Sequence, residues 1–241
     1  IASATLPTVS AHVATGELAG LRKTLASALR MVLVINIPAS LGLIFLSRPI
    51  IALIYEHGKF KQTDTDATSK ALIFYAIGLF AYSGIKVVVP AFYALGRSRV
   101  PVIISTISVV VNIALNLWLI EPLGYLGLAL GTSLTAIGNF GFLFRQLQHS
   151  AGPLATREIF TLGLKMVAAS MIMGTVSMKS HAWLLPSGAH VGLTLEAGLL
   201  GLSIGLGLAT LYGVCRLMGI EEIEIARGVV QRKLSKLLGR A

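Results

Sequence analysis

The chain has 241 residues, of which 55% are hydrophobic and only 12% are charged, and its mean hydropathy is +0.81. These values exclude an ordinary soluble domain and are typical of a protein that is surrounded mainly by lipid. The formal net charge of +10 does not indicate a nucleic-acid partner, because the basic residues are spread over the ends of apolar runs instead of forming one patch.

Apolar runs recur along the whole sequence, and each is long enough to cross a bilayer, which takes about 20 helical residues. They are continuous, whereas the strands of a membrane β-barrel alternate between apolar and polar residues. The sequence therefore predicts an all-α polytopic membrane protein, in which the end of one helix at 1–12 is followed by six complete transmembrane helices. We place these helices at about 29–47, 69–95, 100–120, 123–146, 160–180 and 192–217. The opening residues lack the features of a signal peptide, so we expect the chain to begin inside a helix.

The longest joint between predicted spans covers residues 47–70. It combines a short amphipathic stretch with Gly58, a residue type that often ends a helix. Thr63 and Asp64 are good N-cap residues, so we expect the next helix to begin at one of them.

Lys86 stands near the centre of the span predicted at 69–95. From Lys86 to Arg97 at the end of that span a helix rises about 16 Å, which is farther than a lysine side chain reaches. A lysine at the centre of a membrane helix costs about 2.5–3.5 kcal/mol and usually faces a water-filled cavity or a partner. We expect Lys86 to line an aqueous cavity. The alternative is a structural ion pair with a buried acid, for which Glu196 is the main candidate.

Two prolines, Pro38 and Pro90, lie inside predicted spans. Each lacks the N–H that would bond the carbonyl four residues earlier, so each favours a helix kink. Kinks of this kind occur in moving transporters and also in static helix bundles, so they do not decide the function.

Asn112 and Asn116 are one helical turn apart and share a face. Their amides could bind a polar substrate, form a monovalent-cation site with Thr132 of the next helix, or hydrogen-bond between helices. The last is the most common in membranes and contributes about 1 kcal/mol per bond. All three alternatives stay open on the sequence.

Features of a catalytic site are missing from the sequence. The single cysteine, Cys215, cannot form a disulfide within this chain, and no His or Cys cluster has metal-ligand spacing. The acidic residues lie almost entirely in the joints, so none is placed to hold a catalytic metal or act as a base inside a span. We expect no enzyme activity, no metal and no cofactor; coupling to a monovalent cation or to the membrane potential is compatible with this.

The basic residues predict the orientation of the chain. If the joint at 11–28 faces the cytoplasm and the sides then alternate, the same side receives the basic residues of 96–99, 145–157 and 216–241. The positive-inside rule then places the C-terminus in the cytoplasm.

The last stretch, 219–241, has apolar residues at helical spacing, with acids first and bases last. This pattern predicts a basic amphipathic tail helix. The helix would either contact anionic lipid headgroups or pack only against loops.

Four stretches carry a resemblance to a known family: LPTVSAHVATGE followed by a basic helix, LIYEHGKF, KVVVPAFYALGRSRVP, and VVVNIALNLWLIEPLGYLGLALGTSLTA. Together they are similar to the C-terminal half of the MurJ/MviN family of lipid II flippases, which belongs to the superfamily of multidrug, oligosaccharidyl-lipid and polysaccharide exporters. The motifs occur in the family's order over residues 1–147, and beyond 150 the resemblance rests on two further spans.

The resemblance implies a fourteen-helix flippase fold of two lobes, of which this chain would hold the part from the end of the eighth helix onward. Residues 1–147 would form the C-terminal lobe of the core, 148–218 two additional transmembrane helices, and 219–241 the cytoplasmic tail helix. The missing N-terminal lobe and membrane lipids, including anionic ones, would be partners. The location would be the bacterial inner membrane.

The implied substrate is lipid II, an undecaprenyl diphosphate that carries a disaccharide pentapeptide. Alternating access would move it from the cytoplasmic to the periplasmic leaflet for cell-wall synthesis. Lys86 matches a basic position in the family's tenth helix and would neutralise the diphosphate, while the last two helices would form an apolar groove for the prenyl tail.

Three other functions compete with this interpretation: a membrane transferase acting on polyprenyl phosphates, a related exporter of polysaccharide lipids or drugs, and a membrane scaffold that transports nothing. The sequence lacks the transferase's catalytic residues. The motifs YEHGKF and FYALGRSR favour MurJ/MviN over the other exporters.

Overall fold

The computed structural model describes residues 2–185, 192–224 and 228. The elements in this part of the chain are all helices: α1 (Ala2–Ala14), α2 (Leu18–Phe45), α3 (Ser47–Tyr55), α4 (Gln62–Ile77), α5 (Leu79–Ala94), α6 (Arg99–Leu123), α7 (Tyr125–Ala151), α8 (Thr156–Leu184) and α9 (Leu193–Leu217). Within the described residues, six helical stretches are long and apolar enough to cross a membrane, and one of them is α4 and α5 together. The prediction of an all-α polytopic membrane protein is confirmed. The predicted tail helix lies almost wholly outside the described residues.

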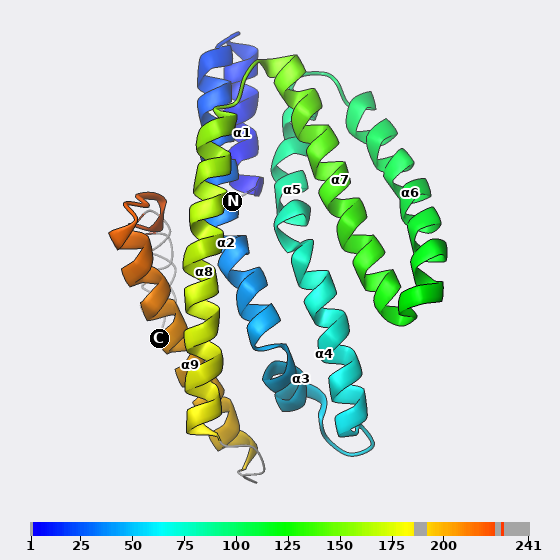
Figure 1. The fold of residues 1–241 in the computed structure, drawn as a ribbon. Helices are drawn as coiled ribbons and strands as arrows, with labels where there is room; N and C mark the ends of the chain where they lie inside the picture. Colours follow the sequence, from blue (N-terminus) through cyan, green and yellow to red (C-terminus); the bar gives the residue numbers. More distant parts are fainter. Residues whose placement is uncertain (1, 186–191, 225–227, 229–241) are drawn as a thin grey trace, which may run out of the picture.

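Helix α2 is the centre of the bundle, because it packs against α1, α4, α5 and α8. Helix α7 packs against α4, α5 and α6, and α9 packs against α8. Figure 1 shows α6 and α9 at opposite edges of the bundle. It also shows α1 and the beginning of α8 at one end, which we call the α1 end, and α3 at the other, which we call the α3 end.

Helix α2 begins at Leu18, well before the predicted start at 29. The basic residues of this stretch lower its hydropathy and hide the helix from a search for apolar runs. Leu21, Leu25 and Leu29 nevertheless recur every fourth residue and are at most 2% exposed. They belong to a core cluster with Phe92 of α5 and Leu143 of α7, so this face of α2 holds the bundle together.

The span predicted at 69–95 is interrupted at Gly78, between α4 and α5. A Cβ atom at residue 78 would lie 2.8 Å from Ser133 Oγ and 2.9 Å from Ser133 Cα. Helix α7 therefore approaches the backbone of residue 78 too closely for any side chain. By contrast, α2 continues through Pro38 and α5 continues through Pro90.

Two serines from neighbouring helices hydrogen-bond the carbonyl groups just before the interruption. Ser40 Oγ of α2 donates to the carbonyl of Ala76 at 2.6 Å. Ser133 Oγ of α7 donates to the carbonyl of Phe74 at 2.7 Å and lies 3.3 Å from that of Tyr75. Both serines are buried. Because an unsatisfied carbonyl in hydrocarbon costs several kcal/mol, these hydroxyls stabilise the interrupted helix.

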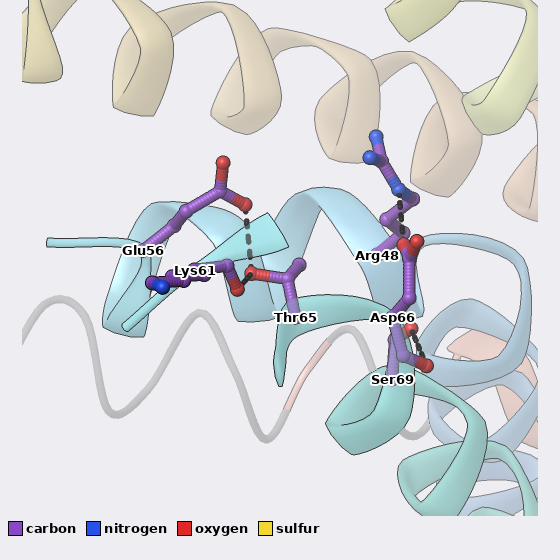
Figure 2. Close-up of polar contacts among 6 residues, drawn as sticks. All are labelled: Arg48, Glu56, Lys61, Thr65, Asp66 and Ser69. Atoms are coloured by element: carbon purple, nitrogen blue, oxygen red, sulfur yellow. Dashed lines mark hydrogen bonds and ion pairs between the residues drawn. The ribbon is translucent and has the colours of Figure 1, made fainter. Parts of the chain in front are cut away.

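Helices α3 and α4 form a hairpin at the α3 end (Figure 1), and Figure 2 shows polar contacts between them. Arg48 Nε lies 2.8 Å from Asp66 Oδ1, and the hydroxyl of Thr65 donates to Glu56 Oε2 at 2.7 Å. The chain turns between the two helices at Gly58, which has a φ of +63°.

Helix α4 begins at Gln62, slightly before the predicted Thr63 or Asp64. The reason is that the Asp64 carboxylate accepts the backbone N–H of Lys61 at 2.9 Å, so Asp64 lies in the first turn and Lys61 is the N-cap residue.

We expect Gly78→Ala to destabilise the full-length protein by about 1–3 kcal/mol, because the added methyl group would overlap α7. The matched control is Gly138→Ala inside α7, where a Cβ meets nothing within 4 Å and alanine gains about 1 kcal/mol of helix propensity. Thermal unfolding in detergent measures both. A Gly78→Ala protein that is as stable as the Gly138→Ala protein would contradict this packing.

Candidate functional site

Lys86 lies on the face of α5 that the described helices leave uncovered. It is exposed, as are Tyr82 one turn before it and Tyr93 two turns after it, whereas Val87 and Val88 on the opposite face are buried. No ion pair joins Lys86 to another residue in the described ranges. The ammonium group at the middle of this span is therefore not neutralised by the described part of the chain.

Glu196, the acid considered as a structural partner of Lys86, lies elsewhere. It stands in the first turn of α9 and lines a pocket of about 250 Å³ with Ala52, Glu56 and His57 at the α3 end. The structure therefore does not bring Lys86 and Glu196 together.

Polar contacts connect α5 to α7 and α7 to α6. The hydroxyl of Tyr82 lies 3.5 Å from the carbonyl of Thr132, which joins α5 to α7. Asn112 Nδ2 of α6 donates to Thr135 Oγ1 of α7 at 3.3 Å. Thr132 and Thr135 are one turn apart on α7, so these contacts lie near each other along that helix. We use the name polar belt for the residues of these contacts together with Asn116 and with Lys86, which follows Tyr82 by one turn of α5: Tyr82, Lys86, Asn112, Asn116, Thr132 and Thr135.

Asn112 and Asn116 hydrogen-bond to each other, since Asn116 Nδ2 donates to Asn112 Oδ1 at 3.2 Å. Of the three alternatives for these amides, the hydrogen bond between helices is present, and it joins Asn112 of α6 to Thr135 of α7. Asn116 Oδ1 is different: it lies against Gly131 of α7, is buried, and has no hydrogen-bond partner among the described residues. It is an acceptor that a donor or a cation would satisfy.

Thr135, rather than the predicted Thr132, provides the hydroxyl that faces the asparagines. Both hydroxyls donate within α7, that of Thr132 to the carbonyl of Leu128 at 2.7 Å and that of Thr135 to the carbonyl of Gly131 at 2.8 Å, but only Thr135 Oγ1 also accepts a hydrogen bond from Asn112. The sequence indicates which face of α7 lies against α6, because Gly127, Gly131 and Thr135 are spaced every four residues on one face. At both glycines a side chain would overlap α6, so this is the face that α6 approaches.

Pro38 and Pro90 have different surroundings. Pro38 lines an apolar groove of about 510 Å³ between α2 and α9, with α8 contributing Met173 and Ser177. A second apolar groove, of about 520 Å³, lies between α2, α7 and α8 and includes Gly84 of α5. Pro90 follows Lys86 by one turn of α5 and leaves the carbonyl of Lys86 without a helical donor.

Comparison with known proteins adds independent evidence. The sequence model of the family described as lipid II flippase MurJ matches residues 1–214. The probable lipid II flippase MurJ of Vibrio cholerae is 31% identical over 224 residues, which are 92% of this chain and 42% of that protein. The corresponding protein of Rickettsia prowazekii is 30% identical over 217 residues, or 89% of this chain and 42% of the relative.

A solved structure is also similar. The structure described as lipid II flippase MurJ in an inward closed conformation matches with a TM-score of 0.69 and 27% identity, over 90% of this chain and 43% of that chain. The chain thus spans less than half the length of the relatives it matches, which agrees with the expected half of a flippase. Since the family model covers most of its residues, the chain belongs to the lipid II flippase MurJ family.

Proposed function

We propose that the complete protein containing this chain moves lipid II from the cytoplasmic to the periplasmic leaflet, and that α5, α6 and α7 form one wall of its cavity. The observation that carries this proposal is Lys86, which is exposed in the middle of a transmembrane span and has no ion pair in the described part of the chain. A charge left in hydrocarbon would cost about 2.5–3.5 kcal/mol, so this face is expected to meet water.

The chemistry of the substrate matches the exposed charge. The diphosphate of lipid II carries negative charge that must leave water when the headgroup crosses the membrane. A lysine ammonium is a compact point charge that neutralises phosphate oxygens without requiring one fixed geometry. Lys86 would therefore hold the diphosphate while alternating access moves the headgroup from one side to the other.

A lobe encoded outside this chain would close the cavity. Helix α6 supports this, because almost none of its apolar stretch is buried in the described structure. Asn112 and Asn116 nevertheless lie in this helix.

The apolar groove between α2 and α9 would hold the prenyl tail, since its lining is almost entirely aliphatic.

The orientation proposed for the chain puts the α1 end in the cytoplasm. Arg22, Lys23, Arg97 and Arg99 belong to the α1 end by their places in the helix order, and positive loops stay inside. Trp118 and Trp183 are 70% and 82% exposed near the ends of α6 and α8, where interfacial indoles are common.

A coupling cation is a second proposal, and the unsatisfied Asn116 Oδ1 favours it. Asn112 Oδ1 and Thr135 Oγ1 belong to the same hydrogen-bonded chain of side chains between α6 and α7. Neutral carbonyl oxygens bind monovalent cations in channel filters.

We expect Lys86→Ala in the full-length protein to impair lipid II translocation strongly while membrane insertion stays normal, because the diphosphate loses its counter-charge. Lys86→Arg should retain much of the activity, since charge matters more than shape here. The matched control is Lys70→Ala, which removes an exposed lysine from the same span outside the polar belt. Translocation in proteoliposomes measures all three. Unchanged transport by Lys86→Ala would contradict the role of Lys86 in holding the diphosphate.

For the cation, we expect Asn116→Asp to increase the apparent affinity for sodium or potassium, because a carboxylate replaces a neutral ligand. Thr135→Val should reduce this affinity, because Thr135 Oγ1 is hydrogen-bonded to Asn112, and Thr132→Val should not, because the Thr132 hydroxyl bonds to Leu128 and to neither asparagine. Transport with sodium, potassium or choline outside the vesicles measures the effect. If Asn116→Asp responds to these ions as the parent protein does, the site is only an interhelical contact.

A further inference from the structure

A charged pocket of about 570 Å³ lies at the α1 end, between α2, α8 and the residues that follow α9. It is separate from the polar belt and shares no lining residue with either apolar groove. Its charged lining residues have both signs: Arg30, Arg157 and Lys165 are basic, and Glu158 and Glu222 are acidic.

Arg30 is the centre of the pocket. Arg30 Nη1 lies 3.2 Å from Glu158 Oε2, and Arg30 Nε lies 3.7 Å from Glu222 Oε1. The side chain of Glu222 is 21% exposed and that of Glu158 is 67% exposed, so Glu222 is the inner acid and Glu158 stands at the rim. Each carboxylate contacts Arg30 through one oxygen, and its other oxygen forms no ion pair among the described residues.

The two remaining cations differ in their contacts. Lys165 Nζ donates one hydrogen bond to the carbonyl of Met218 at 3.2 Å and has two further N–H donors. Arg157 is exposed at the rim and forms no ion pair within the described ranges. The pocket thus presents donors for an anion and acceptors for a cation at the same time.

The pocket lies at the boundary between charged sequence and hydrocarbon. Arg30 directly precedes the apolar run 31–46, and Lys165 directly precedes 166–178. The apolar run of α9 ends just before Arg216, beside the segment that lines the pocket. Leu162 and Ile220 form buried apolar lining. Arg30, Lys165 and Arg216 thus stand at the charged ends of apolar runs, which in a bilayer lie near the lipid headgroups.

We propose that this pocket binds the phosphoethanolamine headgroup of a membrane phospholipid that is not transported. The phosphate accepts hydrogen bonds from Arg157 and Lys165, and the primary ammonium donates to the carboxylates of Glu158 and Glu222. A headgroup with only negative charge would be repelled by both carboxylates, because it would place that charge beside them. Choline cannot donate a hydrogen bond to them, and the aromatic residues that usually hold quaternary ammonium groups are absent from the described lining.

The test is native mass spectrometry of the full-length protein with phosphatidylethanolamine, phosphatidylglycerol and phosphatidylcholine of identical acyl chains. The parent protein should retain phosphatidylethanolamine best. Arg157→Gln should weaken its binding about tenfold, the equivalent of one charge-assisted hydrogen bond. The matched control is Arg145→Gln, which removes an exposed arginine of α7 outside the pocket and should leave binding unchanged.

A change of selectivity separates ligand contact from a purely structural role. Glu222→Gln removes one acid from the pocket, so the preference should move from phosphatidylethanolamine toward phosphatidylglycerol. If Glu222→Gln lowers the thermal stability, Glu158→Gln at the exposed rim provides the same comparison. Equal retention of the three lipids by the parent, equal losses in Arg157→Gln and Arg145→Gln, or an unchanged lipid preference in the glutamine variants would overturn the proposal. Because lipid retention is measured and not transport, the outcome does not depend on the proposed function.

Discussion

Backbone and side-chain polar groups inside hydrocarbon have no water to bond, and this constraint governs the bundle. It is most visible at Gly78, where the close approach of α7 leaves no room for a side chain and the helix stops. The carbonyls before the interruption are then bonded by Ser40 of α2 and Ser133 of α7. Two buried hydroxyl groups thus fix how α4 and α5 sit against the rest of the bundle, and α5 carries Lys86.

The same constraint explains the polar belt. Tyr82, Asn112 and Thr135 form contacts between helices and so satisfy most of their polar atoms within the described structure. Lys86 and Asn116 Oδ1 are the exceptions, one a cation without an ion pair and the other a buried acceptor without a donor in the part described. Lys86 is the group assigned to the diphosphate in the proposed function, and Asn116 Oδ1 is the group assigned to a coupling cation. For this reason the two proposals rest on unsatisfied groups and not on well-bonded ones.

The helices were predictable from the sequence because membrane spans depend mainly on hydropathy, and each predicted span overlaps an observed helix. The early start of α2 was not predicted, since its basic residues mask the buried leucines at 21, 25 and 29. The interruption at Gly78 was missed as well. A single glycine inside a span is ordinary, and only the position of Ser133 in space shows why this one is required. Thr132 was named in place of Thr135 because the rotation of α7 toward α6 is set by packing, which hydropathy does not describe.

The interruption at Gly78 also bears on the order in which the protein is assembled. Ser40 precedes Gly78 in the chain, whereas Ser133 follows it on α7, so only one of the two hydroxyl donors has been synthesised when α4 and α5 enter the membrane. Until α7 arrives, the carbonyl of Phe74 lacks its serine donor, and a continuous helix would satisfy it instead. The set of hydrogen bonds at Gly78 is therefore complete only once α7, a later part of the polypeptide, has docked against α4.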